Sequence, residues 1–97
     1  METYISFMKL TEQGIRDVKN FPQRLEAGTK ALEAAGGKMT GFYAVMGEYD
    51  YVAISEGPNA EAAMAVLLAL GAAGNVRTVT QRAFTAEEFA RIVQRIP

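Results

Sequence analysis

The chain contains neither cysteine nor histidine. Without cysteine it can form no disulfide bond, no thiolate metal site and no cysteine nucleophile. Without histidine it lacks the commonest general base and the usual side-chain ligand of zinc and haem iron. Carboxylates, arginine, lysine, tyrosine and hydroxyl groups remain for chemistry, so we expect no metal site and no cofactor.

An excess of charge of either sign is also missing. Ten basic and eleven acidic residues give a net charge of -1, with both signs spread along the chain. Because no basic block could collect phosphates, we do not expect a nucleic acid partner. The longest uncharged stretch, residues 62–76, is too short to span a bilayer and predicts a buried helix instead. The N-terminus lacks the pattern of a signal peptide, which predicts a cytoplasmic protein.

What the chain does have is apolar sequence that one small domain cannot easily cover. The 97 residues, 49% of them apolar, predict one globular domain over residues 1–97. Between residues 42 and 54, two β-prone segments flank the polar turn Gly47-Glu48-Tyr49-Asp50, which predicts a β-hairpin. Both segments are apolar on both faces, and such strands need cover on each face. The pattern therefore favours self-association.

The remaining patterns predict the order β-α-β-β-α-β-α. Thr11 can cap a first helix that Pro22 divides, and Gly36-Gly37 can end it. Asn59 can cap the second helix, and the capping box Thr85 to Glu88 opens the last. Two split βαβ units of this kind form a ferredoxin-like α+β sandwich. The predicted elements are strands at 3–10, 38–46, 51–56 and 76–84, and helices at 22–35, 60–70 and beyond 85.

Both long helices of this fold cover one face of the sheet and leave the other bare. Alternation places Ile5, Phe7, Val52 and Ile54 on the helix side. On the open side it places Tyr4, Ser6, Met8, Tyr51, Ala53 and Ser55. It does not decide which face Arg77 to Arg82 occupy. We expect a second copy to cover the open face, burying roughly 800 Å² per partner; the alternative is that the C-terminal helix folds across it.

The topology also brings several polar residues to one edge of the sheet. Lys9, Thr11, the turn at 48–50 and residues 75–77 meet there, and Asp50 and Arg77 lie on strands roughly 10 Å apart. Arg77 could hold an anionic group while nearby side chains orient it. Alternatively, Asp50 accepts amides of its own turn and forms a structural ion pair with Arg77. The candidate ligand-binding residues are Tyr43, Glu48, Tyr49, Asp50, Asn75 and Arg77.

Several motifs resemble those of the GYD domain family, small bacterial and archaeal proteins named for a Gly-x-Tyr-Asp motif. Gly-Glu-Tyr-Asp stands at 47–50, Gly-Asn-Val-Arg-Thr at 74–78 and Arg-Ala-Phe at 82–84. Leu-Thr-x-x-Gly at 10–14 and Ala-Ala-Gly-Gly-Lys at 34–38 extend the match over nearly the whole chain. The resemblance implies a ferredoxin-like domain that assembles as a dimeric α/β-barrel, but it implies no particular activity.

Three functions are compatible with these features. The first is a homo-oligomeric regulatory domain that binds a small anionic or polar-aromatic ligand near Asp50 and Arg77. The second is a cofactor-free isomerase or oxygenase that uses Asp50 or Glu48 as base and Arg77 to stabilise an anion. The third is a purely structural assembly unit. Proteins of the dimeric α/β-barrel kind include enzymes and ligand sensors, so the fold does not choose among them.

Overall fold

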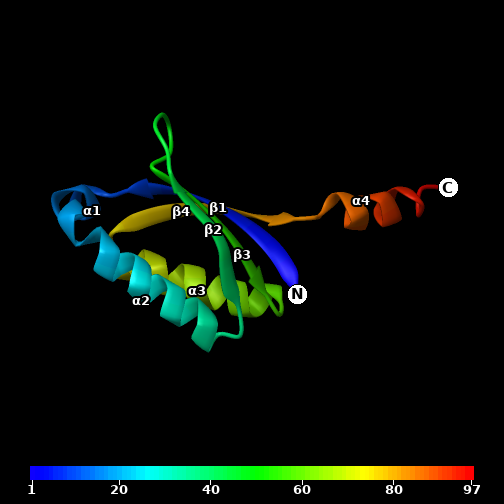
Figure 1. Cartoon of the computed structure of the whole chain (residues 1–97), viewed down its shortest axis with the longest axis horizontal. Helices are drawn as coiled ribbons and strands as arrows, with labels where there is room; N and C mark the ends of the chain where they lie inside the picture. The colour runs from blue at the N-terminus through cyan, green and yellow to red at the C-terminus, as the bar shows by residue number, and fades with distance from the viewer.

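The computed structural model describes residues 1–97, and its elements follow the predicted order. The strands pair antiparallel in the order β2-β3-β1-β4, which is the arrangement of a ferredoxin-like sandwich. Helices α2 and α3 lie on the same side of this sheet (Figure 1). The elements are β1 (Glu2–Leu10), α1 (Glu12–Arg16), a 3-10 turn (Val18–Asn20), α2 (Phe21–Ala34), β2 (Lys38–Ala44), β3 (Tyr51–Gly57), α3 (Ala60–Ala73), β4 (Val76–Ala83) and α4 (Ala86–Val93).

The predicted helix boundaries rest on local chemistry that the structure confirms. Thr11 accepts the amide of Gly14 and caps α1. Pro22 lies in the first turn of α2, separated from α1 by the 3-10 turn. Gly36, with φ +88°, follows α2 in the left-handed conformation that glycine tolerates.

Two boundaries differ from the prediction by more than one residue. Helix α3 continues through Gly71 to Ala73, and Gly74 ends it at φ +84°. Its many alanines favour the helix enough to offset one interior glycine, which costs only about 1 kcal/mol. Strand β2 ends at Ala44, because residues 45–50 leave the sheet as a projecting loop that exposes Met46 completely (Figure 1).

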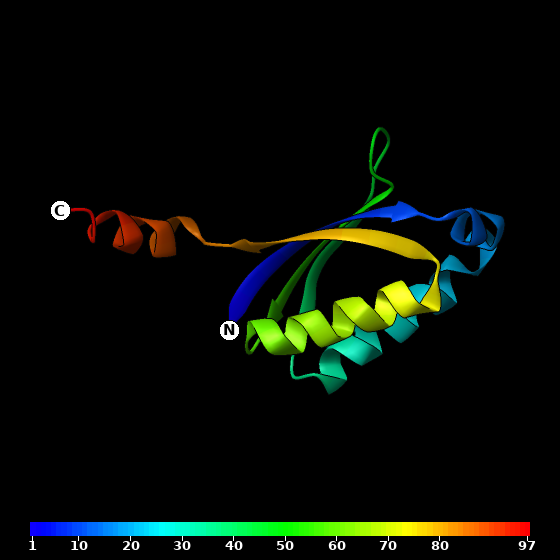
Figure 2. The ribbon, with the colours of Figure 1, turned by 180° about the vertical axis from the view of Figure 1, so that it is seen from behind.

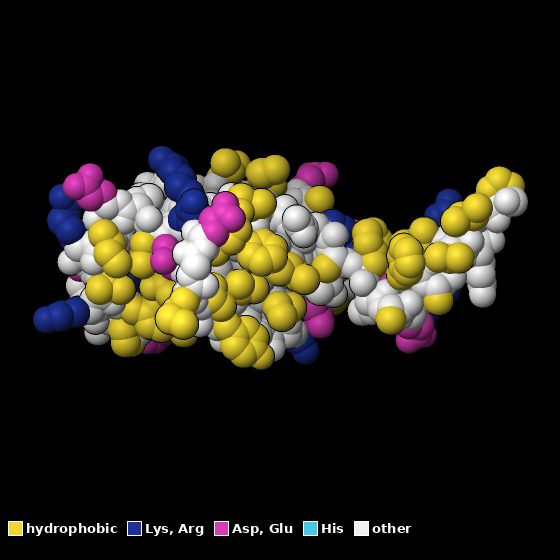
Figure 3. Space-filling view, turned by 90° about the horizontal axis from the view of Figure 1, so that it is seen from above, with side chains coloured by type: hydrophobic (Ala, Val, Ile, Leu, Met, Phe, Trp, Pro, Cys, Tyr) yellow, Lys and Arg dark blue, Asp and Glu magenta, His cyan; other side chains and the backbone are white.

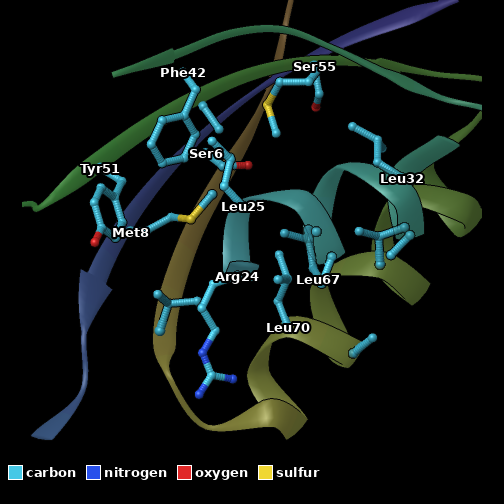
Figure 4. Close-up of a pocket in the computed structure, with 18 of the residues that line it drawn as sticks. Ser6, Met8, Arg24, Leu25, Leu32, Phe42, Tyr51, Ser55, Leu67 and Leu70 are labelled. Atoms are coloured by element: carbon cyan, nitrogen blue, oxygen red, sulfur yellow. The ribbon is translucent and has the colours of Figure 1, made fainter. Parts of the chain in front are cut away.

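The predicted assignment of sheet faces is wrong. Tyr4, Ser6, Met8 and Ala53 are buried beneath α2 and α3, and Tyr51 and Ser55 lie on the same side (Figure 4). The open face instead carries the residues predicted for the helix side, namely Ile5, Phe7, Val52 and Ile54. The prediction assumed that the bulkiest aliphatic side chains lie beneath the chain's own helices. In the structure, small and hydroxyl-bearing residues occupy much of that side.

Strand register settles β4, which alternation left open. Val79 pairs with Phe7 and Gln81 pairs with Ile5, so both lie on the open face. Thr80 pairs with Ser6 on the helix side, and the two hydroxyls are 2.8 Å apart. Seen from the open side, apolar side chains form a broad area over the sheet (Figure 3).

Helix α4 does not fold across that open face. It continues from β4 and projects away from the sheet and from the other helices (Figures 1 and 2). The alternative of self-coverage by α4 is therefore wrong for this conformation. No helix of the chain has the length and hydropathy that crossing a membrane would require.

Candidate functional site

Asp50 has a structural role at the edge where the candidate residues were predicted to meet. It lies just before β3, and its backbone amide donates to the carbonyl of Met8 at 2.9 Å. Its carboxylate Oδ2 accepts the backbone amide of Leu10 at 2.8 Å. Asp50 thus extends the pairing between β1 and β3 by one step, with its side chain replacing a backbone carbonyl. We predicted that the Asp50 carboxylate accepts amides of its own turn. This is wrong, because the donor is the Leu10 amide of β1.

Arg77 forms no ion pair with Asp50. Asp50 lies just before β3 and Arg77 lies in β4, and these strands flank β1. Arg77 pairs in register with Lys9 and is exposed. No carboxylate lies within 4.0 Å of the Arg77 guanidinium. The Asp50 carboxylate is engaged with the Leu10 amide, whereas Arg77 shares the open face with another cation. The structural ion pair considered for these residues is therefore absent.

Tyr49 connects the hairpin loop to the open face. Its ring centroid lies 5.2 Å from that of Phe7, and Lys9 Nζ is 5.8 Å from the ring centroid of Tyr49. An aromatic pair with a cation over one ring is a stabilising arrangement. Tyr43, paired with Val52, is also on this face and is 61% exposed. Glu48 is exposed in the loop.

Asn75 belongs to a different cluster, at the junction of α1 with the turn before β4. Its carbonyl accepts the amide of Thr11 at 3.0 Å, and its side-chain oxygen accepts from Gln13 Nε2 at 3.2 Å. Gly14 packs so closely here that a Cβ would lie 2.0 Å from the Asn75 carbonyl oxygen. Asn75 therefore fixes the position of α1. It is also the one candidate residue of the six that lines a cavity between the sheet and helices α2 and α3.

That cavity lies between the sheet and helices α2 and α3, and it was not predicted. It has a volume of about 320 Å³, within the range of small-molecule pockets. Leu25 and Leu32 of α2 and Leu67 and Leu70 of α3 face Met8 and the aromatic rings of the sheet (Figure 4). The cavity is thus on the side of the sheet opposite Phe7 and Val79.

One end of the cavity is aromatic. The rings of Phe21, Phe42 and Tyr51 form a triangle whose centroids lie 5.3 to 5.5 Å apart. Phe21 begins α2, whereas the other two rings come from neighbouring strands. Burial, and secondarily the Asp50 carboxylate, raises the pKa of the Tyr51 phenol, so this group is neutral at pH 7.

The charged residues that line the cavity near α2 are already paired. Arg24 forms an ion pair with Asp17, which also accepts from Asn20. These hydrogen bonds, the one from Arg24 foremost, hold the pKa of Asp17 below its usual range. Asp17 is therefore ionised at neutral pH and is a poor candidate for a general base.

The sequence does contain a signal for this cavity. The sides of α2 and α3 that line it carry glycine and alanine at Ala27, Gly28, Ala31, Ala35, Ala62, Ala63, Ala69 and Ala73. Side chains this small leave space beneath the helices that the sheet must fill. The prediction places Ser6, Ala53 and Ser55 on the open face, and that placement hides the shortage of side-chain volume between sheet and helices.

Comparison with known proteins agrees with the motifs. A protein of Thermus thermophilus, named as a glutamine synthetase and cystathionine beta-lyase binding protein, is 32% identical over 94 residues. The aligned region covers 95% of this chain and 99% of that relative. The family model of the GYD domain matches residues 4–93. The chain therefore belongs to the GYD domain family.

Proposed function

We propose that this chain is a non-catalytic, homo-oligomeric regulatory domain that binds another protein. The observation that carries the proposal is the apolar surface that the fold leaves uncovered, over the open sheet face and along α4. Val79 is 49% exposed on the sheet, and Phe89 and Ile96 are 59% and 69% exposed beyond it. Contiguous apolar surface of this kind marks protein interaction sites.

We assign the open sheet face and the apolar stripe of α4 to a second copy of this chain. A four-stranded face of about six residues per strand offers roughly 400 Å², from a strand spacing of about 4.8 Å and a rise of about 3.4 Å. A standard interface buries about 800 Å² per partner. The stripe of α4, with Phe89, Ile92 and Val93, and Ile96 just after the helix would supply much of the difference by packing against the second copy.

The relative supports a protein partner in addition to self-association. Its name states that it binds glutamine synthetase and cystathionine beta-lyase, and this chain aligns with nearly its whole length. We propose that one of these two enzymes, or both, is the partner of this chain.

The geometry gives less support to the alternative of a cofactor-free enzyme. That reaction requires a carboxylate base inside an apolar pocket. Asp50 is held by the Leu10 amide and Glu48 is exposed in the loop, and neither lines the cavity. The proposed anion site around Arg77 stays a prediction, to be tested by Arg77→Ala in any ligand screen.

Light scattering after size exclusion tests the self-association. The protein concentrations are about 10 to 100 μM, chosen to exceed the dissociation constant of a specific dimer. At these concentrations the wild-type chain is expected to have the mass of two or more copies. Val79→Asp should give a single copy, because a buried charge on the sheet face has no partner. Gln23→Asp, an exposed position on α2, is the matched control and should not change the mass. A wild-type chain that runs as a single copy throughout this range would overturn the assignment.

The role of α4 is tested by a charge-matched pair. Phe89→Glu lies on the apolar stripe of α4, and Gln94→Glu lies at the C-cap, directed away from that stripe by helical spacing. Only Phe89→Glu should weaken self-association if the stripe packs on the second copy. Equal behaviour of the two variants would contradict this placement of α4.

Interferometry with the immobilised chain tests the protein partner. Purified glutamine synthetase and cystathionine beta-lyase are offered separately, with serum albumin as control. Saturable binding of at least one enzyme, without binding of albumin, supports the proposal. No binding of either enzyme at about 100 μM would contradict it, since specific protein complexes are tighter than this.

A further inference from the structure

The cavity between the sheet and helices α2 and α3 is not explained by self-association, because it opens on the other side of the sheet. We propose that it is a binding site for a small, uncharged aromatic molecule that hydrogen-bonds to the Tyr51 hydroxyl. This inference deepens the proposed function, since it gives the regulatory domain a ligand. It rests on the volume, the lining and the unused hydrogen-bonding groups of the cavity.

The volume limits the ligand to a small molecule. A water molecule occupies roughly 30 Å³ in the liquid, so 320 Å³ corresponds to about ten waters, or an organic molecule of roughly ten to fifteen non-hydrogen atoms. The lining is almost entirely apolar, so a ligand that displaces water from it gains the free energy of burying apolar surface. An apolar occupant would therefore stabilise the native chain.

The lining favours an aromatic occupant. The Phe21, Phe42 and Tyr51 rings form one wall, and Leu25, Leu67 and other aliphatic side chains form the remainder (Figure 4). Aromatic rings pack well against one another in tilted and offset arrangements, as these three already do. A flat ring system would continue this arrangement into the cavity.

The polar groups exclude a charged ligand. Ser6 and Thr80 bond to each other, and Arg24 is paired with Asp17. The remaining charged residue of the lining, Glu56, pairs in register with Thr3, which puts its side chain on the open face and its backbone at the cavity. No hydrogen bond within the chain engages the hydroxyl of Tyr51 or of Ser55, although both residues line the cavity. Two neutral hydroxyls with free capacity can satisfy a ligand hydroxyl or ring N–H, but an unpaired ligand charge would be costly to bury.

Titration calorimetry with 2-naphthol as the probe tests the site. The neutral probe should bind the wild-type chain, and 2-naphthoate, of similar shape but anionic, should bind at least tenfold more weakly. Tyr51→Phe removes only the hydroxyl and should weaken 2-naphthol about five- to tenfold, the value of one hydrogen bond. Equal affinity for the two probes, or no effect of Tyr51→Phe, would overturn the ligand class.

A filling substitution tests the location. Ala63→Leu on α3 places extra volume in the cavity and should weaken 2-naphthol at least tenfold, whereas Ala72→Leu, on the exposed side of the same helix, should have no effect. Nuclear Overhauser contacts give a second readout in the wild-type chain. They should join the probe to the Met8 methyl, which lines the cavity, and not to that of Met46. Undiminished binding by Ala63→Leu, or contacts to Met46 alone, would contradict the assignment.

The monomeric variant separates this inference from the proposed function. Val79→Asp alters only the open face, so it should bind 2-naphthol as the wild-type chain does. If 2-naphthol fails to bind while self-association and enzyme binding are observed, the ligand site alone is wrong. If 2-naphthol binds but the chain neither self-associates nor binds either enzyme, the proposed function alone is wrong.

Discussion

Single side chains at the start of β3 and at the α1 junction hold the sheet and the first helix in place. The Asp50 carboxylate accepts a β1 amide that would otherwise meet only solvent, and Gly14 admits the Asn75 carbonyl where any Cβ would collide. Both residues lie in the motifs that resemble those of the GYD family, Leu-Thr-x-x-Gly at 10–14 and Gly-x-Tyr-Asp at 47–50. Their contacts give these motif positions a structural role.

The Asp50 contact has a measurable value. Asp50→Ala should lower the free energy of unfolding by about 2 kcal/mol, because it leaves the Leu10 amide without its charged acceptor. Asp50→Asn should cost less, since an amide oxygen can still accept. Urea unfolding at pH 7 measures both, with the exposed loop variant Glu48→Gln as control, expected within about 0.5 kcal/mol of wild type. Comparable losses for Glu48→Gln and Asp50→Ala would contradict the structural role.

Among the elements, α4 has the least tertiary support and relies most on its own cap. Thr85 accepts the Glu88 amide at 3.1 Å, and the Glu88 carboxylate accepts the Thr85 amide at 2.8 Å. This reciprocal pair is the capping box predicted from the sequence. A helix of eight residues is marginal by itself, so the cap contributes a large share of its stability.

Thr85→Ala should therefore destabilise α4 by about 1 kcal/mol. Backbone chemical shifts of residues 86–93 should move toward coil values while those of the sheet stay unchanged. The measurement is best made in the Val79→Asp background, where self-association cannot hold the helix. Shifts that stay helical in Thr85→Ala would show that the cap is dispensable.

The same cap makes α4 sensitive to acid. The Thr85 amide, the largest influence, holds the pKa of Glu88 below its usual range. Because the pKa of Glu88 is lower in the folded helix than in the unfolded chain, its carboxylate stabilises the helix fully when the pH is above the unfolded-state pKa of about 4.3. This stabilisation is lost as the pH falls through the lowered, folded-state pKa. The helical shifts of α4 should diminish in that window, and Glu88→Gln should remove the pH dependence. Glu87→Gln removes an exposed ion pair with Arg91 and should leave the pH dependence of the α4 shifts in place.

For the whole molecule, the proposed self-association predicts that stability depends on protein concentration. A partner that binds only the folded chain stabilises it by mass action, so the melting temperature of an oligomer rises with protein concentration. Scanning calorimetry should therefore show a higher melting temperature at about 100 μM than at about 10 μM, the limits of the concentration range used for light scattering. The melting temperature of Val79→Asp should not change with concentration. An unchanging wild-type value would argue that the open face stays uncovered.

The order of elements, the helix caps and the ferredoxin-like topology could be predicted from the sequence. These depend on near neighbours: Thr11, Asn59 and Thr85 each cap the helix that follows them, and Gly36 and Gly74 permit a left-handed turn. Such signals act within a few residues and can be recognised in one segment at a time.

The side of the sheet that faces the helices and the partner of the Asp50 carboxylate depend on contacts between distant segments, so the sequence did not reveal them. When both faces of a strand are apolar, alternation separates the faces but does not say which one the helices cover. That choice depends on how side chains from α2 and α3 pack against the sheet. Because the facing side chains of both helices are small, a cavity remains between them and the sheet. Likewise, the Leu10 amide lies 40 residues before Asp50, and only the register of β1 against β3 brings the two together.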